Sequence, residues 1–324
     1  MTTASVATNS FHRIAHAKIN LCLHVTGRRP DGYHTLDSLV GFAAYGDRIT
    51  IHEAATDSFE IKGPFAGSLQ GQSPAQNLVV KARDWLRVRH QALGLATGAV
   101  KVLLYKQLPI SSGIGGGSAD AAATLATLAR LWRTPHDVLE DHQAIATELG
   151  ADVPMCLRQS PLRVTGIGER MAPWQHVPLL PCVLVNPGLA VSTPEVFKAL
   201  KTRNNQTLHG MPPAFGNVDN VAQWLAQMTR NDLQAPAQTL CPPIGECVAK
   251  LEQSGAKFAR MSGSGATCFG LFDSVEKAHV ASAAIAQEQP EWFVQATAIL
   301  PSPPLRDEDY EAWVESMKTV RSLH

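Results

Sequence analysis

The sequence predicts an α+β protein with two domains, and three observations lead to this prediction. The chain has 324 residues, which is enough for about two domains of ordinary size. Segments with alternating apolar residues, typical of strands, are interspersed along the chain with segments of helical spacing. A stretch rich in proline (Pro173, Pro178 and Pro181) follows residue 165. We therefore expect one domain over residues 1–165, a second over residues 166–300, and a terminal appendage over residues 301–324.

The first domain is expected to alternate strands and helices. Strands are predicted over residues 18–25, 48–51 and 100–105, and residues 54–76, rich in Gly, Ser, Pro and Gln, are expected to be irregular. Helices are predicted over 77–90, from 118 until Pro135 stops the pattern, and over 137–149, with 151–154 as a loop.

The second domain shows the same mixture. Strands are predicted over 183–185, 258–260 and 267–272, and helices near 194–201, 218–228, 243–254 and 275–287.

Composition restricts the class of protein. Hydrophobic residues make up 45% and charged residues 17%, as in a soluble globular chain. The 28 basic and 28 acidic residues balance, without long blocks of one sign, so we expect no nucleic-acid or membrane partner. Six scattered cysteines without a C-x-x-C pair predict reduced thiols, a cytoplasmic location and no metal site. No signal peptide or spanning helix is expected, and the chain is expected to be a monomer or a homodimer.

A glycine-rich loop carries the strongest chemical signal. It has the sequence PISSGIGGGSAD over residues 109–120, between a predicted strand and a predicted helix. Glycines let backbone N–H groups approach a phosphate, and the helix N-terminus adds about half a positive charge. It is not a Walker loop, and Ser118 stands where a dinucleotide fingerprint needs a third glycine. We predict phosphate binding; a flexible turn without a ligand is the alternative.

A second glycine loop, MSGSGA over residues 261–266, lies between two predicted strands. A tight hairpin would explain it equally well. Two such loops, one in each predicted domain, suggest a phosphate chain that is held from both sides.

Single polar residues are ambiguous by themselves. Lys18 at the start of a strand could be a solvated end, and Asp152 after a helix could be a turn residue or a cap. Tyr33 and His34 lie in a polar turn, where exposure is the simplest interpretation. The acceptor of a phosphate cannot be deduced from these residues alone.

Three motifs in the expected order resemble the GHMP superfamily of small-molecule kinases: AKIN at 17–20, the first glycine loop, and MSGSGA at 261–266. Further segments resemble the branch that serves the non-mevalonate route to isoprenoid precursors, whose acceptor alcohol carries a cytidine diphosphate group. These segments are AKINLCLHVTGRRPDGYHTL from residue 17, YGD at 45–47, NL at 77–78, LGADVP at 149–154, TPEVF at 193–197 and ND at 231–232. The resemblance covers about residues 13–300. It implies a two-domain GHMP kinase fold with the active site in the interdomain cleft, and transfer of phosphate from ATP to a 2-hydroxyl group.

The resemblance also implies roles for residues. Asp152 would be the base and Lys18 its partner in catalysis, with Mg²⁺ held mainly through phosphates and water, so that no protein ligand to it is named. Asn77 and Lys106 would lie near the adenosine of ATP. The phosphates would be bound by Pro109, Ile110, Ser111, Ser112, Gly113, Ile114, Gly115, Gly116, Gly117, Ser118 and Ala119.

The acceptor would be bound by a second group of residues. Asn20 would bind its polyol or phosphate part, Tyr33 and Phe197 would sandwich the cytosine, and His34 would hydrogen-bond its edge. Ile167 and Thr193 match neighbouring contact positions. The chain departs from the family pattern at Ser111, Ser112, Ile114 and Ala119, which leaves the hydroxyl contacts there open.

Two other functions compete with this interpretation. Another GHMP kinase would act on mevalonate, homoserine or a sugar, but these acceptors have no base to stack on Phe197. A non-catalytic nucleotide-binding protein would not need both Lys18 and Asp152. Substitution of Asp152 by asparagine separates the kinase from the binding protein.

Overall fold

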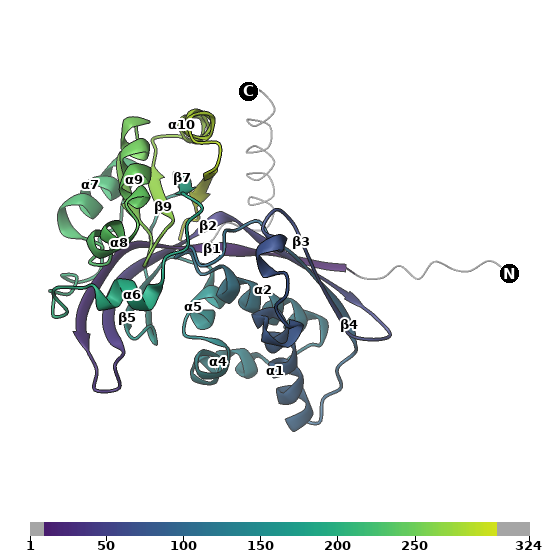
Figure 1. Cartoon of the computed structure of the whole chain (residues 1–324). Coiled ribbons are helices and arrows are strands. Elements are labelled where there is room, and N and C mark those ends of the chain that lie inside the picture. Colours follow the sequence, from purple (N-terminus) through teal and green to yellow (C-terminus); the bar gives the residue numbers. More distant parts are fainter. Residues whose placement is uncertain (1–9, 303–324) are drawn as a thin grey trace. The chain divides into compact units, whose positions relative to one another are not determined.

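The computed structural model describes residues 10–302, so the predicted appendage lies, after Ser302, outside the described residues. The chain forms two compact units, coloured along the sequence in Figure 1. Within the described range, the first unit contains residues 10–15, 46–108 and 116–157, and the second contains 16–45, 109–115 and 158–302. Two long strands, β1 (Ser10–Arg28) and β2 (His34–Glu53), contribute residues to both units.

The first unit combines a small sheet with helices. β4 (Val100–Tyr105) pairs antiparallel with the second half of β2 and parallel with β3 (Ser58–Lys62). Helices α1 and α2 pack against each other beside this sheet (Figure 1). The remaining bounds are η1 (Ala66–Leu69), η2 (Pro74–Gln76), α1 (Leu78–Ala92), α2 (Gly116–Leu131), α3 (His136–Glu140), α4 (His142–Leu149) and α5 (Val153–Arg158).

Several local predictions for this unit need correction. Residues 54–76 are not irregular throughout, because β3 lies within them as a short, half-buried strand. The predicted helix over 137–149 is two helices, since Asp141 caps α4 by accepting a hydrogen bond from the Ala144 N–H at 3.0 Å. The predicted loop over 151–154 contains the start of α5, where Pro154 occupies the first turn and no intrahelical N–H is lost.

The second unit contains an antiparallel sheet in the order β10–β7–β9–β8. Its strands are β7 (Leu180–Asn186), β8 (Phe258–Met261), β9 (Cys268–Leu271) and β10 (Phe293–Ile299), the last of which was not predicted. A separate pairing joins β5 (Leu162–Gly166) to β2 and to β6 (Arg170–Pro173). The helices are α6 (Thr193–Lys198), α7 (Val218–Met228), α8 (Gln234–Leu240), α9 (Pro243–Gln253) and α10 (Val275–Glu288).

The core of the second unit lies between the sheet and its helices. Val183 and Val185 on β7 alternate with side chains on the other face, and they pack in one buried cluster with Ile244 and Leu251 of α9. The cluster includes Leu23 of β1, so the buried core anchors this strand close to its polar residues Lys18 and Asn20. Among residues 10–302, no helix has both the length and the apolar character needed to cross a bilayer.

Candidate active site

β1 holds two of the predicted site residues on one face of the strand. Lys18 and Asn20 are two residues apart, so their side chains point the same way. Both are buried, and Lys18 Nζ donates to Asn20 Oδ1 at 3.1 Å. Asn20 Nδ2 donates in turn to Ser38 Oγ at 2.8 Å. The structure therefore brings the predicted catalytic lysine and the predicted acceptor-binding amide into direct contact.

The first part of the first glycine loop passes close to this strand. The Lys18 N–H donates to the Ile114 carbonyl at 2.9 Å. Gly115 has φ +64°, and a Cβ there would lie 3.1 Å from Lys18 Cε. Gly113 has φ +74°, and a Cβ would lie 2.6 Å from the backbone oxygen of Ser262. These two glycines are required because side chains are disfavoured at such φ angles and have no space here.

The second glycine loop packs backbone to backbone against the first. Ser262 Oγ donates to the Gly113 carbonyl at 3.2 Å and accepts from the Asn20 N–H at 3.0 Å. The Thr267 N–H donates to the Ser112 carbonyl at 3.1 Å. Residues 109–115 and 261–266 thus belong to the same unit, although the sequence had placed one loop in each predicted domain.

Residues predicted to bind a cytosine lie in the second unit. The rings of His34 and Phe197 stack with centroids 4.6 Å apart and an interplanar angle of 21°. Burial, aided by Arg28 and Arg203, lowers the pKa of His34, so its imidazole is neutral near pH 7. Its Nε2 atom is buried and has no hydrogen-bond partner among the described residues. A neutral ring nitrogen of this kind can serve the polar edge of a ligand.

The other residues predicted to contact the acceptor lie at or next to the ends of strands and helices. Tyr33 is 64% exposed and precedes β2. Thr193 begins α6, and its hydroxyl is 2.7 Å from Ser264 Oγ in the second glycine loop. The Ile167 N–H donates to Glu169 Oε2 at 2.6 Å in the turn after β5. Their roles toward a substrate stay predictions.

The first unit carries the rest of the predicted ATP residues. Gly116, Gly117, Ser118 and Ala119 form the first turn of α2, where backbone N–H groups lack intrahelical partners and favour anions. Asn77 caps α1 by accepting from the Val79 N–H at 2.9 Å. Asn77 therefore has a structural role as the N-cap of this helix, and its position near the adenosine of ATP stays a prediction.

Lys106 lies inside the first unit between two carboxylates. Its ammonium contacts Asp47, and it donates to Asp120 Oδ2 at 2.9 Å, with all three side chains at most 4% exposed. Burial would lower the pKa of Lys106, but Asp120 and Asp47 outweigh it and raise this pKa. Burial raises the pKa of Asp120 well above its usual value, against the opposing effect of Lys106. Sequence reasoning did not identify this group, although Asp47 and Asp120 stand in the YGD and SAD segments.

Asp152 lies in the first unit, immediately before α5. Its carbonyl accepts a hydrogen bond from the Cys156 N–H at 3.1 Å, and the residue is half-buried. Lys18 belongs to the second unit.

Comparisons with known proteins agree with these features. Models of GHMP kinases match residues 77–160, for the N-terminal domain, and residues 211–290, for the C-terminal part. The 4-diphosphocytidyl-2-C-methyl-D-erythritol kinase of Chelativorans sp. (strain BNC1) is 48% identical over 293 residues, covering 90% of this chain and 97% of that protein. The kinase of the same name from Rhizobium johnstonii is 49% identical over 297 residues, covering 90% and 94%. The chain belongs to this family of GHMP kinases.

Solved structures support the family and the fold. A crystal structure of 4-(cytidine 5'-diphospho)-2C-methyl-D-erythritol kinase matches with a TM-score of 0.70 and 31% identity, covering 89% of this chain and 99% of that one. Homoserine kinase from Cytophaga hutchinsonii matches with a TM-score of 0.60 at 16% identity, which indicates a shared fold only. The predicted α+β GHMP kinase fold is confirmed.

Proposed function

We propose that the chain transfers the γ-phosphoryl group of ATP to the 2-hydroxyl of 4-diphosphocytidyl-2-C-methyl-D-erythritol. The observation that carries this proposal is the identity of 48–49% with kinases of that name over about 90% of the chain. The aromatic pair of His34 and Phe197 is consistent with it, because a cytosine can stack on an aromatic ring. Mevalonate, homoserine and galactose have no flat base that could do so.

In this proposal Asp152 accepts the proton of the acceptor hydroxyl. A positioned base of this type contributes about 10²–10⁴-fold to a rate. Lys18 holds the developing negative charge, with its ammonium oriented by Asn20 Oδ1. Most of the remaining acceleration comes from positioning around the transferred group.

The residues of the first glycine loop and of the first turn of α2 fit a nucleoside triphosphate. The first turn of α2 offers backbone N–H groups, and Gly113 and Gly115 let the loop before it pack closely against Ser262 and Lys18. When bound, ATP supplies the phosphoryl group and the good leaving group. We propose that Mg²⁺ accompanies it, bound chiefly through phosphate oxygens and water.

The acceptor is recognised at its base. The unpartnered Nε2 of His34 hydrogen-bonds the polar edge of the cytosine, and Phe197 and Tyr33 provide aromatic surface for stacking. A buried polar atom that only the right ligand satisfies discriminates strongly against acceptors without a base. We place the reaction in the cytoplasm, because all six cysteines are buried and free, as in a reducing compartment.

The test is ADP release with Mg-ATP and four separate acceptors: the cytidyl alcohol, mevalonate, homoserine and galactose. We expect turnover with the cytidyl alcohol alone. Asp152→Asn should lose about 10²–10⁴-fold in kcat while nucleotide affinity is kept. Asp137→Asn, at an exposed aspartate in α3, is the matched control and should retain wild-type turnover. Turnover of another acceptor would disprove the cytosine site, and nucleotide binding without any turnover would favour a non-catalytic protein.

A further inference from the structure

A short connector between α7 and α8, residues 229–232, runs beside β1 and is bonded to it. The Leu23 N–H donates to the Arg230 carbonyl, and the Asp232 N–H donates to the Leu23 carbonyl, each at 2.9 Å. The Val25 N–H donates to Asp232 Oδ2 at 2.7 Å. The connector therefore lies along the strand that carries Lys18 and Asn20.

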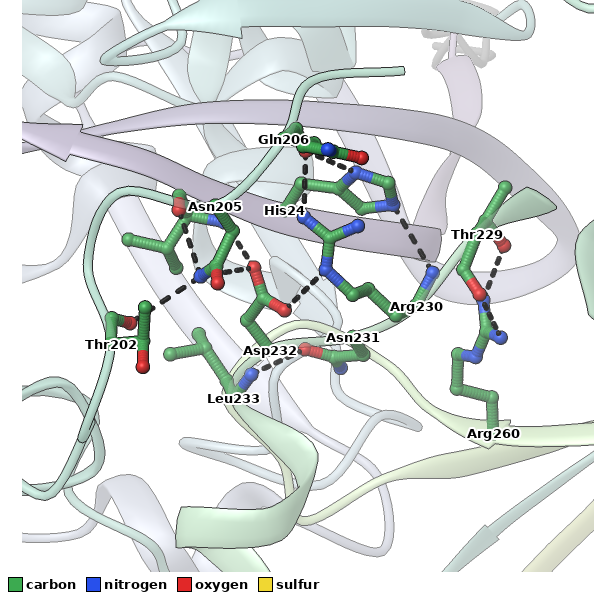
Figure 2. A network of polar contacts seen from close by, with 11 residues as sticks. His24, Thr202, Asn205, Gln206, Thr229, Arg230, Asn231, Asp232, Leu233 and Arg260 are labelled. Carbon is green, nitrogen blue, oxygen red and sulfur yellow. Dashed lines mark hydrogen bonds and ion pairs between the residues drawn. The ribbon is translucent and has the colours of Figure 1, made fainter. Parts of the chain in front are cut away.

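A polar network fixes this connector from several directions (Figure 2). His24 Nε2 accepts from the Arg230 N–H at 3.1 Å, while its Nδ1 donates to the Gln206 carbonyl at 3.1 Å. Arg230 Nε donates to Asp232 Oδ1 at 2.7 Å, and Asn205 Nδ2 donates to Asp232 Oδ2 at 3.0 Å. Residue 231 is thus held between two anchored neighbours.

Asn231 uses every hydrogen-bonding atom of its amide. Its Oδ1 accepts from the Leu233 N–H at 3.0 Å, as Figure 2 shows. Its Nδ2 donates to the carbonyls of Met261 and Gly263, at 2.8 and 2.9 Å. The side chain is buried, so these bonds are protected from water.

The two carbonyls that Asn231 binds flank Ser262. That serine joins the Asn20 N–H to the Gly113 carbonyl and so connects β1 with the first glycine loop. Gly263 has φ +57°, and a Cβ there would lie 3.0 Å from the Gly113 oxygen and 3.2 Å from Asn20 Oδ1. A small movement of residues 261–263 would therefore displace both the strand and the loop.

We propose that Asn231 is a positioning residue, which holds the second glycine loop in the geometry that Lys18, Asn20 and the first glycine loop need for phosphoryl transfer. The catalytic part of this proposal rests on the proposed function. In this role Asn231 acts through Ser262, which lies between the two carbonyls that it binds. Figure 2 shows the hydrogen bonds that fix the segment around Asn231, so the amide is itself held firmly in place.

Asn231→Asp is the sharpest perturbation, because it keeps the shape and replaces the donor NH₂ by a carboxylate oxygen facing two carbonyls. A protonated carboxyl could restore one of the two bonds, so the variant should improve relative to wild type as the pH falls. Asn220→Asp makes the same change at an exposed position in α7 and is the matched control.

The experiment measures amide hydrogen exchange over residues 258–268 and 18–24, together with kcat and KM. Two lost hydrogen bonds predict exchange about thirtyfold faster in the loop of Asn231→Asp, the equivalent of about 2 kcal/mol at ~1.4 kcal/mol per factor of ten. We expect kcat to fall at least about tenfold, with KM for the acceptor within about threefold. Asn220→Asp should match wild type in both measurements.

The outcomes separate the two proposals. Unchanged exchange in the loop, or faster exchange with unchanged kcat, overturns the role of Asn231. If wild type does not phosphorylate the cytidyl alcohol, the proposed function fails, whereas the exchange contrast still tests whether Asn231 holds the loop. Should Asn231→Asp not fold, Asn231→Ala removes the donors without adding a charge, and the same criteria apply to it.

Discussion

Replacement of Lys106 by methionine should destabilise the protein strongly. The ammonium of Lys106 faces two carboxylates, Asp47 and Asp120, whose side chains are 0% and 4% exposed. Methionine fills a similar space but leaves both carboxylates in the interior without a cation. Removal of one partner from a buried ion pair costs about 3–5 kcal/mol.

The structure places the expected loss at the lower end, about 3 kcal/mol. Asp47 keeps hydrogen bonds from the Gln107 and Leu108 N–H groups. Asp120 can escape its charge by taking up a proton, because burial already raises its pKa. For the same reason Asp120→Asn should change the free energy of unfolding by less than about 1 kcal/mol, since one ammonium opposes two carboxylates and one negative charge is surplus.

Urea denaturation followed by circular dichroism measures these changes. Lys62→Met is the control, because Lys62 forms a solvent-exposed pair with Glu60 that contributes little to stability. A loss below about 1 kcal/mol for Lys106→Met, with a raised KM for ATP, would refute the reasoning. That result would instead favour the adenosine contact expected from the sequence.

Three further predictions follow from single contacts. Gly113→Ala should cost about 2–4 kcal/mol in unfolding free energy and most of kcat, because of its positive φ and its approach to the Ser262 oxygen; wild-type melting and turnover would contradict this. Asp37→Asn should lower the free energy of unfolding by about 2–3 kcal/mol, because Arg163 donates to both carboxylate oxygens of the buried Asp37. A loss under roughly 0.5 kcal/mol in urea denaturation, as for an exposed pair, would disprove this. Burial, then Arg230, lowers the pKa of His24, so its stabilising contribution is complete above about pH 6.5 and declines as the pH falls toward the lowered pKa. His24→Gln should therefore lose less unfolding free energy than wild type between pH 7.5 and 5.5, and equal losses would contradict the assignment.

Local features of the fold could be predicted where one short segment determines the structure. The helix start at Asn77 was predicted from residue type and periodicity, and the structure confirms it as the N-cap of α1. The bounds of β4 and α7 agree with their predicted ranges. β3 was missed because it has only five residues and lies in a stretch rich in Gly, Ser, Pro and Gln, although its sequence SFEIK does alternate between polar and apolar residues. Its pairing with β4 depends on residues about forty positions away.

The candidate site likewise has features that one short segment determines and features that depend on contacts between distant segments. The glycine loops could be recognised as local motifs, and the family resemblance supplied roles for Lys18 and Asp152. No periodicity links residues 20, 113 and 262, so the contacts through Ser262 appeared only in three dimensions. The interior pairing of Lys106 was equally inaccessible, because it joins side chains from three separate segments.

Identification of the product tests the central claim most directly. The chain is incubated with Mg-ATP and 4-diphosphocytidyl-2-C-methyl-D-erythritol, and the product is analysed by mass spectrometry and phosphorus NMR. We predict the gain of one phosphoryl group on the 2-hydroxyl of the erythritol part, formed about 10²–10⁴-fold more slowly by Asp152→Asn and at the wild-type rate by Asp137→Asn. An unmodified acceptor, or a phosphate at another hydroxyl, would contradict the account.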